Sequence, residues 1–217
     1  MNIIDIKMSV FTSENEFKYE NNDLMALLKI FEGKHIIPGY FIEVGSKKRI
    51  NRPFIKNIDD NTMITIGSSR IDIKFDNLDK EIKKEYNDKY FIEFMELNIN
   101  YFNKLIEYFS LQINRIALNI EIKPHNIFQI INYIDFYKDN QQYNAMQIKV
   151  HRFDNFNHDI NVVSDLISNK DNINLKLDIN TSYNPKNKFS YNDLTTFFED
   201  GFNLSNELIN QFTTNNK

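Results

Sequence analysis

Hydrophobic and polar residues alternate strictly in several short segments of this chain. In residues 3–10 (IIDIKMSV), the apolar Ile4, Ile6, Met8 and Val10 alternate with polar residues. Successive side chains of a β-strand point to opposite faces, so this pattern predicts a strand with one apolar side. The same alternation predicts further strands at residues 62–66, 71–75, 115–122, 146–150 and 173–179.

Two turn sequences predict hairpins between neighbouring strands. The sequence GSS at residues 67–69 separates two of the strands named above, and glycine and serine are typical of tight turns. Residues 45–48 (GSKK) separate two further strand-like runs, YFIEV and RPFIKNI. We therefore expect a second hairpin with cations at its turn.

A different period predicts the helices. Between Tyr90 and Leu111, apolar residues recur every three or four positions, which is the spacing of one helix face. Other helices are predicted at residues 22–31, 79–85, 126–137 and 191–212. Ser190 and Asp193 have the spacing of a capping box at the start of the last helix, and Gly201 is a candidate kink within it.

The order and the one-sidedness of these elements predict the fold class. Strands that are apolar on one side indicate an antiparallel sheet with helices on one face, which is an α+β arrangement. The order of strand, helix, further strands and long helix occurs twice along the chain. We expect two similar lobes, residues 1–112 and residues 113–217, each an antiparallel sheet with helices packed on one face.

Composition narrows the class of protein. The chain has 217 residues, 41% hydrophobic and 26% charged, which is ordinary for a folded protein. It has no cysteine, which excludes disulfides and cysteine-ligated metals, and a net charge of -4. Its 33 asparagines, with a similar enrichment in isoleucine, indicate the codon bias of an AT-rich bacterium or its phage.

Targeting signals are not expected. The first ten residues contain Asp5 and Lys7, and no run of about 18 apolar residues occurs in the sequence. We therefore expect neither a signal peptide nor a membrane span, and predict a cytoplasmic protein.

The polar side of the predicted strands is a candidate binding surface. Charges of both signs alternate there and aromatic residues are scarce, which disfavours base stacking with single-stranded nucleic acid. Such a face fits a protein partner by charge complementarity, or is simply solvated. The candidate contacts on it are Lys7, Lys74, Glu121, Lys149 and Lys176.

The hairpin at residues 45–56 is the second candidate surface. Five cations gather in this short stretch: Lys47, Lys48, Arg49, Arg52 and Lys56. Phosphate contacts by such a loop would gain affinity from counterion release. The stretch lacks interleaved aromatic residues, so a solvated hairpin, an acidic protein partner and nucleic acid all remain open interpretations.

Signals for catalysis are weak. The sequence contains no nucleophile elbow, phosphate-binding loop, dinucleotide fingerprint or HExxH motif, so we expect neither an enzyme nor a cofactor. The stretch His151–Asp159 (HRFDNFNHD) offers the donors His151, Asp154, His158 and Asp159, but their spacing matches no metal-ligand pattern. We interpret the stretch as a polar connection, with a metal-dependent hydrolase using His151, Asp154 and His158 as the third alternative.

Other isolated polar residues are interpreted as structural. His35 and His125 lie next to turns, where a single histidine is usually structural. Asp59 and Asp60 are neighbours in sequence, and we do not expect them to form an acid/base pair.

The order of several segments resembles a known group of proteins. IGSSRIDIKF followed by a long aromatic-rich helix, then INRIALNIEI, and finally LKLDINT before a last helix, is similar to a sporadically distributed family of uncharacterised bacterial proteins. The resemblance implies a two-lobed α+β fold and a mobile-element or defence context, without an established activity.

These observations lead to a functional hypothesis. We predict a non-enzymatic protein-binding protein of the inhibitor or regulator type, for example a counter-defence protein that occludes a nuclease complex. The alternative is a nucleic-acid-binding protein that uses the basic hairpin.

Overall fold

The structure is a computed structural model that describes residues 2–12, 23–44, 49–75, 88–123, 145–155, 159–169, 172–182, 184 and 186–213. These residues form strands and helices in the order β1 (Asn2–Thr12), α1 (Asp23–Ile30), β2 (Ile36–Val44), β3 (Arg49–Asn57), β4 (Thr62–Ile66), β5 (Arg70–Phe75), α2 (Asp88–Phe109), β6 (Ile113–Lys123), β7 (Ala145–Asn155), β8 (Asp159–Asn169), β9 (Asn172–Thr181) and α4 (Tyr191–Thr213).

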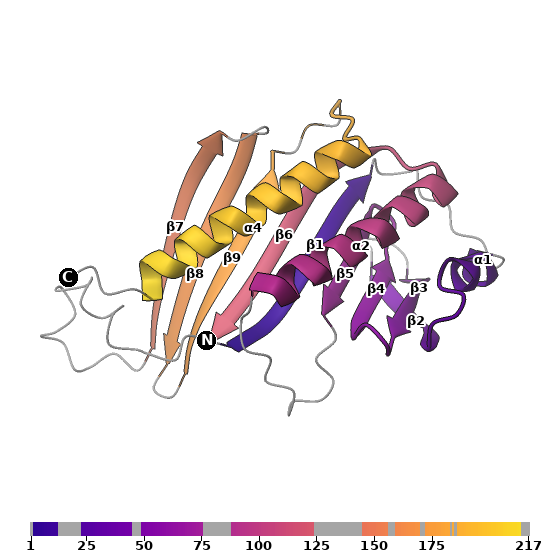
Figure 1. The fold of residues 1–217 in the computed structure, drawn as a ribbon, viewed down its shortest axis with the longest axis horizontal. Helices are drawn as coiled ribbons and strands as arrows, with labels where there is room; N and C mark the ends of the chain where they lie inside the picture. The colour runs from indigo at the N-terminus through magenta and orange to yellow at the C-terminus, as the bar shows by residue number, and fades with distance from the viewer. Residues whose placement is uncertain are drawn as a thin grey trace, which may run out of the picture.

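The strands join in one nine-stranded antiparallel sheet (Figure 1). Its order is β2-β3-β4-β5-β1-β6-β9-β8-β7. The first half of the chain contributes the five strands from β2 to β1, and the second half contributes the other four. The halves meet where β1 pairs with β6, so one sheet runs through both.

The two long helices, α2 and α4, cross the same face of the sheet (Figure 1). Aromatic rings join them, because Phe102 of α2 stacks on Phe198 of α4 with ring centroids 6.1 Å apart. Phe31, directly after α1, packs on Tyr101 of α2 at 4.8 Å and brings α1 into the same layer. The apolar sides of the strands are buried beneath this layer, as one-sided alternation requires.

Two sequence features explain how α4 forms. The Ser190 backbone N–H donates to the Asp193 carboxylate at 2.7 Å, and the Asp193 N–H donates to the Ser190 hydroxyl at 3.3 Å, which confirms the capping box. A Cβ placed on Gly201 would lie 3.1 Å from Cδ2 of Leu118 on β6. Glycine at this position therefore allows close approach of helix to sheet, and α4 continues through it.

The structure confirms most of the predicted elements. The α+β class, the antiparallel sheet and all six strands predicted from alternation are present, as are both hairpins and the helices at 22–31, 90–111 and 191–212. The predicted helices at 79–85 and 126–137 lie outside the described residues.

The prediction of a polar connection at His151–Asp159 is wrong for most of that stretch. His151–Asn155 complete β7, and Asp159 begins β8, a strand that alternation did not predict. The alternation of β8 is interrupted at two positions. Ser164 is polar but buried on the side that faces the helices, opposite Leu177. Val163 is apolar but lies on the other side, opposite Asp178. Polar and apolar residues thus occur on both faces of this strand.

Within the described chain, none of the helices combines the length and apolar character needed to cross a membrane.

Candidate interaction surface

The sheet face opposite α2 and α4, here called the open face, is organised in rows across the strands. Strand pairing places one complete row over all nine strands: Ile37, Lys56, Met63, Lys74, Lys7, Asn119, Asp178, Val163 and His151. Three of the predicted contact residues, Lys74, Lys7 and Lys56, therefore lie in one row. The neighbouring row places Asp5, Glu121, Lys176, Asp165 and Lys149 across β1, β6, β9, β8 and β7.

Polar side chains on the second-half strands of this face pair with one another. Glu121 accepts from Asn174 at 3.0 Å and forms an ion pair with Lys176 at 3.2 Å. Asp178 accepts from Asn119 at 2.8 Å and from Asn180 at 3.1 Å. Each of these carboxylates is held by a partner from a neighbouring strand, so interactions within the chain order this part of the face.

The first-half strands hold a pair of like charges. Lys7 and Lys74 are directly opposite each other in the pairing of β1 with β5. Within the described chain, neither ammonium group has a hydrogen-bond or ion-pair partner. Like charges at directly opposed positions of two strands repel each other. An anion from outside the protein would relieve this repulsion.

Asp5 lies beside these lysines, and its negative charge offsets only part of their positive charge. Burial raises the pKa of Asp5, the charges of Lys74 and Lys7 oppose that change, and Glu121 adds to it. The net direction is upward, so burial outweighs the attraction of the two lysines. A hollow of about 330 Å³ lies over this region, and Asp5, Lys7, Glu121 and Lys176 contribute to its lining.

A second group of cations surrounds Phe11 near the end of β1. The guanidinium carbon of Arg70 lies 5.6 Å from the centroid of the Phe11 ring, and that of Arg115 lies 4.9 Å from it. Asp72 pairs with Arg70 at 2.9 Å and accepts from the Ser9 hydroxyl at 2.6 Å. The ring is thus covered by cations rather than free to stack on a base.

The structure divides the five cations of the basic hairpin. Lys47 and Lys48 lie outside the described residues. Arg49 is exposed, and it lies on the sheet face opposite to that of Arg52 and Lys56, because its position in β3 has the other parity. Lys56 belongs to the nine-strand row of the open face. The stretch does not gather its described cations at one site.

Arg52 is engaged inside the protein. It is buried, donates from Nε to Glu43 at 2.8 Å, and donates to the Ser68 hydroxyl at 2.5 Å. Burial alone would raise the pKa of Glu43, but the hydrogen bonds from Ser68 and the pairing with Arg52 outweigh it and hold the pKa below its ordinary value. This triad connects β2 and β3 to the turn between β4 and β5.

The candidate metal ligands are not brought together by anything the structure describes. His158 lies outside the described residues, and His151 and Asp154 are placed in β7 without described side chains. In the described portion of the chain, no group of three or more His, Asp or Glu residues could hold a metal ion. Lys149 is likewise placed in β7 by its backbone alone.

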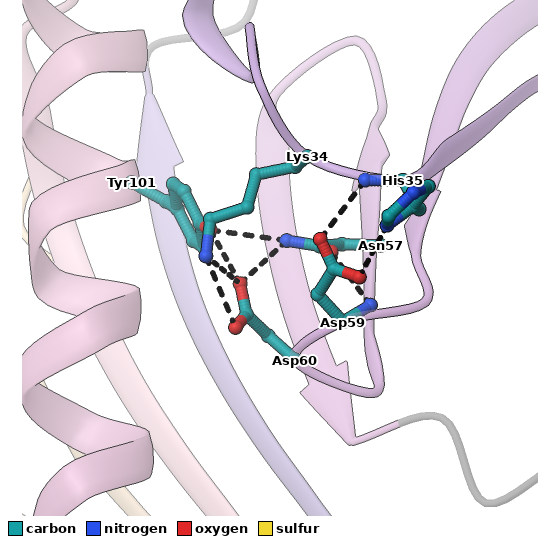
Figure 2. Close-up of polar contacts among 6 residues, drawn as sticks. All are labelled: Lys34, His35, Asn57, Asp59, Asp60 and Tyr101. Carbon is teal, nitrogen blue, oxygen red and sulfur yellow. Dashed lines mark hydrogen bonds and ion pairs between the residues drawn. The ribbon is translucent and has the colours of Figure 1, made fainter.

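Figure 2 shows a polar cluster that the sequence did not predict, centred on Asp60 in the turn between β3 and β4. Asp60 accepts from the Tyr101 hydroxyl at 2.7 Å, from Asn57 Nδ2 at 2.6 Å, and pairs with Lys34 at 3.3 Å. Burial, followed by the hydrogen bond to Asp60, raises the pKa of Tyr101. The phenol therefore stays protonated and acts as a donor rather than as a base.

The neighbouring Asp59 belongs to the same turn but has a different partner. Its carboxylate accepts from the His35 backbone N–H at 3.0 Å and lies 2.7 Å from Nδ1 of the His35 ring (Figure 2). These two bonds, with the backbone bond first, lower the pKa of Asp59. Asp59 and Asp60 thus bind different partners, although they are neighbours in sequence.

The cluster is best interpreted as a structural link between three elements of the fold. Its bonds connect the segment after α1, the β3–β4 turn and α2, and Asp60 interacts with three donor groups. The three elements that it joins are far apart in sequence, since Asp60 and Tyr101 are 41 positions apart and His35 and Asp59 are 24 positions apart. No motif with local spacing could have indicated it.

No protein-family model matches the chain, and no curated protein matches it either.

Proposed function

We propose that this protein is a non-enzymatic binding protein and that its open face contacts another protein. The observation that carries the proposal is the position of α2 and α4 on one side of a nine-stranded sheet, with an ordered polar face on the other. A sheet face with prearranged charges offers specificity to a partner with complementary charges. Lys7, Lys74, Glu121 and Lys176 are the described contact residues on it, and Lys149 is the fifth candidate.

A protein partner is favoured over nucleic acid by the character of this face. Its charges have both signs, and Phe11 is already covered by Arg70 and Arg115. The alternative, nucleic-acid binding through the basic hairpin, is weakened because Arg52 pairs with Glu43. A salt titration separates the two, since phosphate contacts predict a steep loss of affinity with ionic strength.

The proposal includes an internal duplication with lobes 1–112 and 113–217. In each half the first strand is central (β1 and β6), the last strand lies beside it (β5 and β9), and the second lies at the sheet edge (β2 and β7). Each half also ends in a long helix, α2 or α4. This correspondence supports two lobes of similar design, with one extra strand in the first.

Composition and a family resemblance support the inhibitor or regulator role. The AT-rich bias of the composition and the resemblance to a bacterial family in a mobile-element or defence context favour a counter-defence protein of the cytoplasm. Such a protein would act by occluding a surface of its target, which requires an exposed platform and no catalytic group.

The test is differential affinity purification from the native host. The bait is the wild-type chain, the variant Lys7→Gln/Lys74→Gln, or the control Lys104→Gln/Lys186→Gln, which removes the same charge from exposed lysines outside the open face. We expect mass spectrometry to identify a protein that wild type and control retain and that the open-face variant loses. Equal retention by all three baits would contradict the proposal.

A further inference from the structure

The β2 edge of the sheet has few of the features that usually protect an edge strand. β2 is the outermost strand on its side, and none of the described strands pairs with its outer edge. Its nine residues pair with β3 without a register shift. Edge strands are normally protected by lysines, prolines, bulges, inward-pointing charges or short length, because their free backbone groups recruit other strands, and of these features β2 has only Pro38 and Glu43. The single charged residue of β2, Glu43, is turned inward to Arg52 and Ser68.

The exposed side chains of this edge are apolar. Tyr40, Ile42 and Val44 are 49%, 58% and 75% exposed, and as alternate residues they share one face of β2. We refer to residues 40–44 as the edge segment. Alternating apolar side chains beside unpaired backbone groups are the features that an added strand recognises. An extended strand would fit this edge.

The edge segment is complementary to itself. In an antiparallel pair of two edge segments centred on Ile42, Tyr40 of one copy lies opposite Val44 of the other, and the two Ile42 residues face each other. Glu43 then lies opposite Phe41, so the two carboxylates do not meet. Pro38, which has no backbone N–H to donate, lies outside the paired residues. Every contact in this arrangement joins apolar to apolar or charged to uncharged residues.

We propose that two copies of this chain form a symmetric dimer in which the edge segments pair as neighbouring antiparallel strands. A two-fold axis through Ile42 closes the assembly, because both free β2 edges are used. Pairing of β2 with the opposite edge, β7, would be head-to-tail and would continue without closure. The dimer thus joins the two sheets into one and leaves both open faces accessible.

Cysteine cross-linking tests the register directly, because the chain has no cysteine of its own. Residues directly opposite in an antiparallel pair have Cβ atoms about 4.5–5.5 Å apart, within reach of a disulfide after small adjustment. We expect Ile42→Cys to form a disulfide dimer under mild oxidation. The control Ile58→Cys is similarly exposed, at 48%, but lies in the turn between β3 and β4 and should stay monomeric on a non-reducing gel.

Sedimentation of the unmodified protein provides the second arm. We expect wild type at micromolar concentration to show twice the chain mass of 25.9 kDa. Ile42→Lys places two like charges on the axis and should weaken the dimer on the order of a hundredfold, with an unchanged circular dichroism spectrum. Ile42→Thr, which keeps the β-branched shape, should weaken it less.

Three results would overturn the dimer: a wild-type monomer, an Ile42→Lys variant that stays dimeric, or equal cross-linking at positions 42 and 58. A monomer would assign the edge to a strand of another protein. These outcomes do not bear on the open face, because the residues tested are different.

Discussion

Two polar clusters in the first half of the molecule differ in how their charges are used. Around Asp60, the carboxylate is bonded to Tyr101, Asn57 and Lys34, and the cluster joins three elements. On the open face, Lys7 and Lys74 lie directly opposite each other, and the charge of Asp5 compensates them only in part. A carboxylate with several donors stabilises the fold that contains it, whereas like charges that are compensated only in part cost stability.

The largest expected loss of stability comes from removing a hydrogen bond of the Asp60 cluster. Tyr101→Phe removes the hydroxyl that donates to Asp60 and leaves a half-buried carboxylate with one donor fewer. We expect the free energy of unfolding to fall by about 1–3 kcal/mol in urea titrations. Tyr108→Phe, on the exposed side of the same helix, is the matched control and should have no measurable effect. An equal loss in both variants would show that the cluster does not fasten α2.

A smaller effect is expected where the open face is already paired. Lys176→Gln breaks the ion pair with Glu121, which is partly exposed to water. The expected loss is about 0.2–1 kcal/mol, and it should shrink at high salt. Lys186→Gln, an exposed lysine outside the open face, should leave stability unchanged. A loss that does not depend on salt would mean that packing rather than charge holds this pair.

The pH dependence of stability tests whether the contact between Asp59 and His35 stabilises the fold. The pKa of Asp59 is lower in the folded protein than its ordinary value, so the contact with His35 stabilises the fold above that ordinary value. This stabilisation is lost as pH falls through the lowered pKa. We expect wild type to be more stable than Asp59→Asn at neutral pH, and the difference to vanish in acid. A difference that persists in acid would contradict the assignment.

Replacing Asp5 should change stability in the opposite direction to replacing Asp59, and this change is the smallest expected here. Its pKa is raised in the folded protein by burial, so the ionised form is disfavoured there at neutral pH. Asp5→Asn should therefore slightly raise the melting temperature at neutral pH, and this gain should disappear as pH falls through the raised pKa. A lower melting temperature at neutral pH would mean that attraction to Lys7 and Lys74 outweighs burial.

The sequence predicted those parts of the fold in which one strand face is uniformly apolar. β1, β6 and β9 alternate without interruption, and their apolar sides are buried beneath the helices. β8 was missed because Ser164 and Val163 each lie on the face that the simple pattern assigns to the other kind of residue. The burial of a small serine opposite Leu177 is a packing detail that periodicity does not encode.

The arrangement of the candidate surface could be predicted only in part. That Lys7, Lys74, Glu121 and Lys176 share one face follows from alternation. That Lys7 lies opposite Lys74, while Glu121 lies opposite Lys176, depends on which strands are neighbours and on their register. The inward turn of Arg52 likewise depends on Ser68, which lies 16 residues away in another turn.

The most direct test of charge repulsion on the open face is a double-mutant cycle on Lys7 and Lys74. The free energy of unfolding is measured for wild type, Lys7→Gln, Lys74→Gln and the double variant. Because either single substitution removes the mutual repulsion, the double variant should gain about 0.2–1 kcal/mol less than the sum of the two single effects. Additive effects, or a double variant that exceeds the sum, would contradict the account.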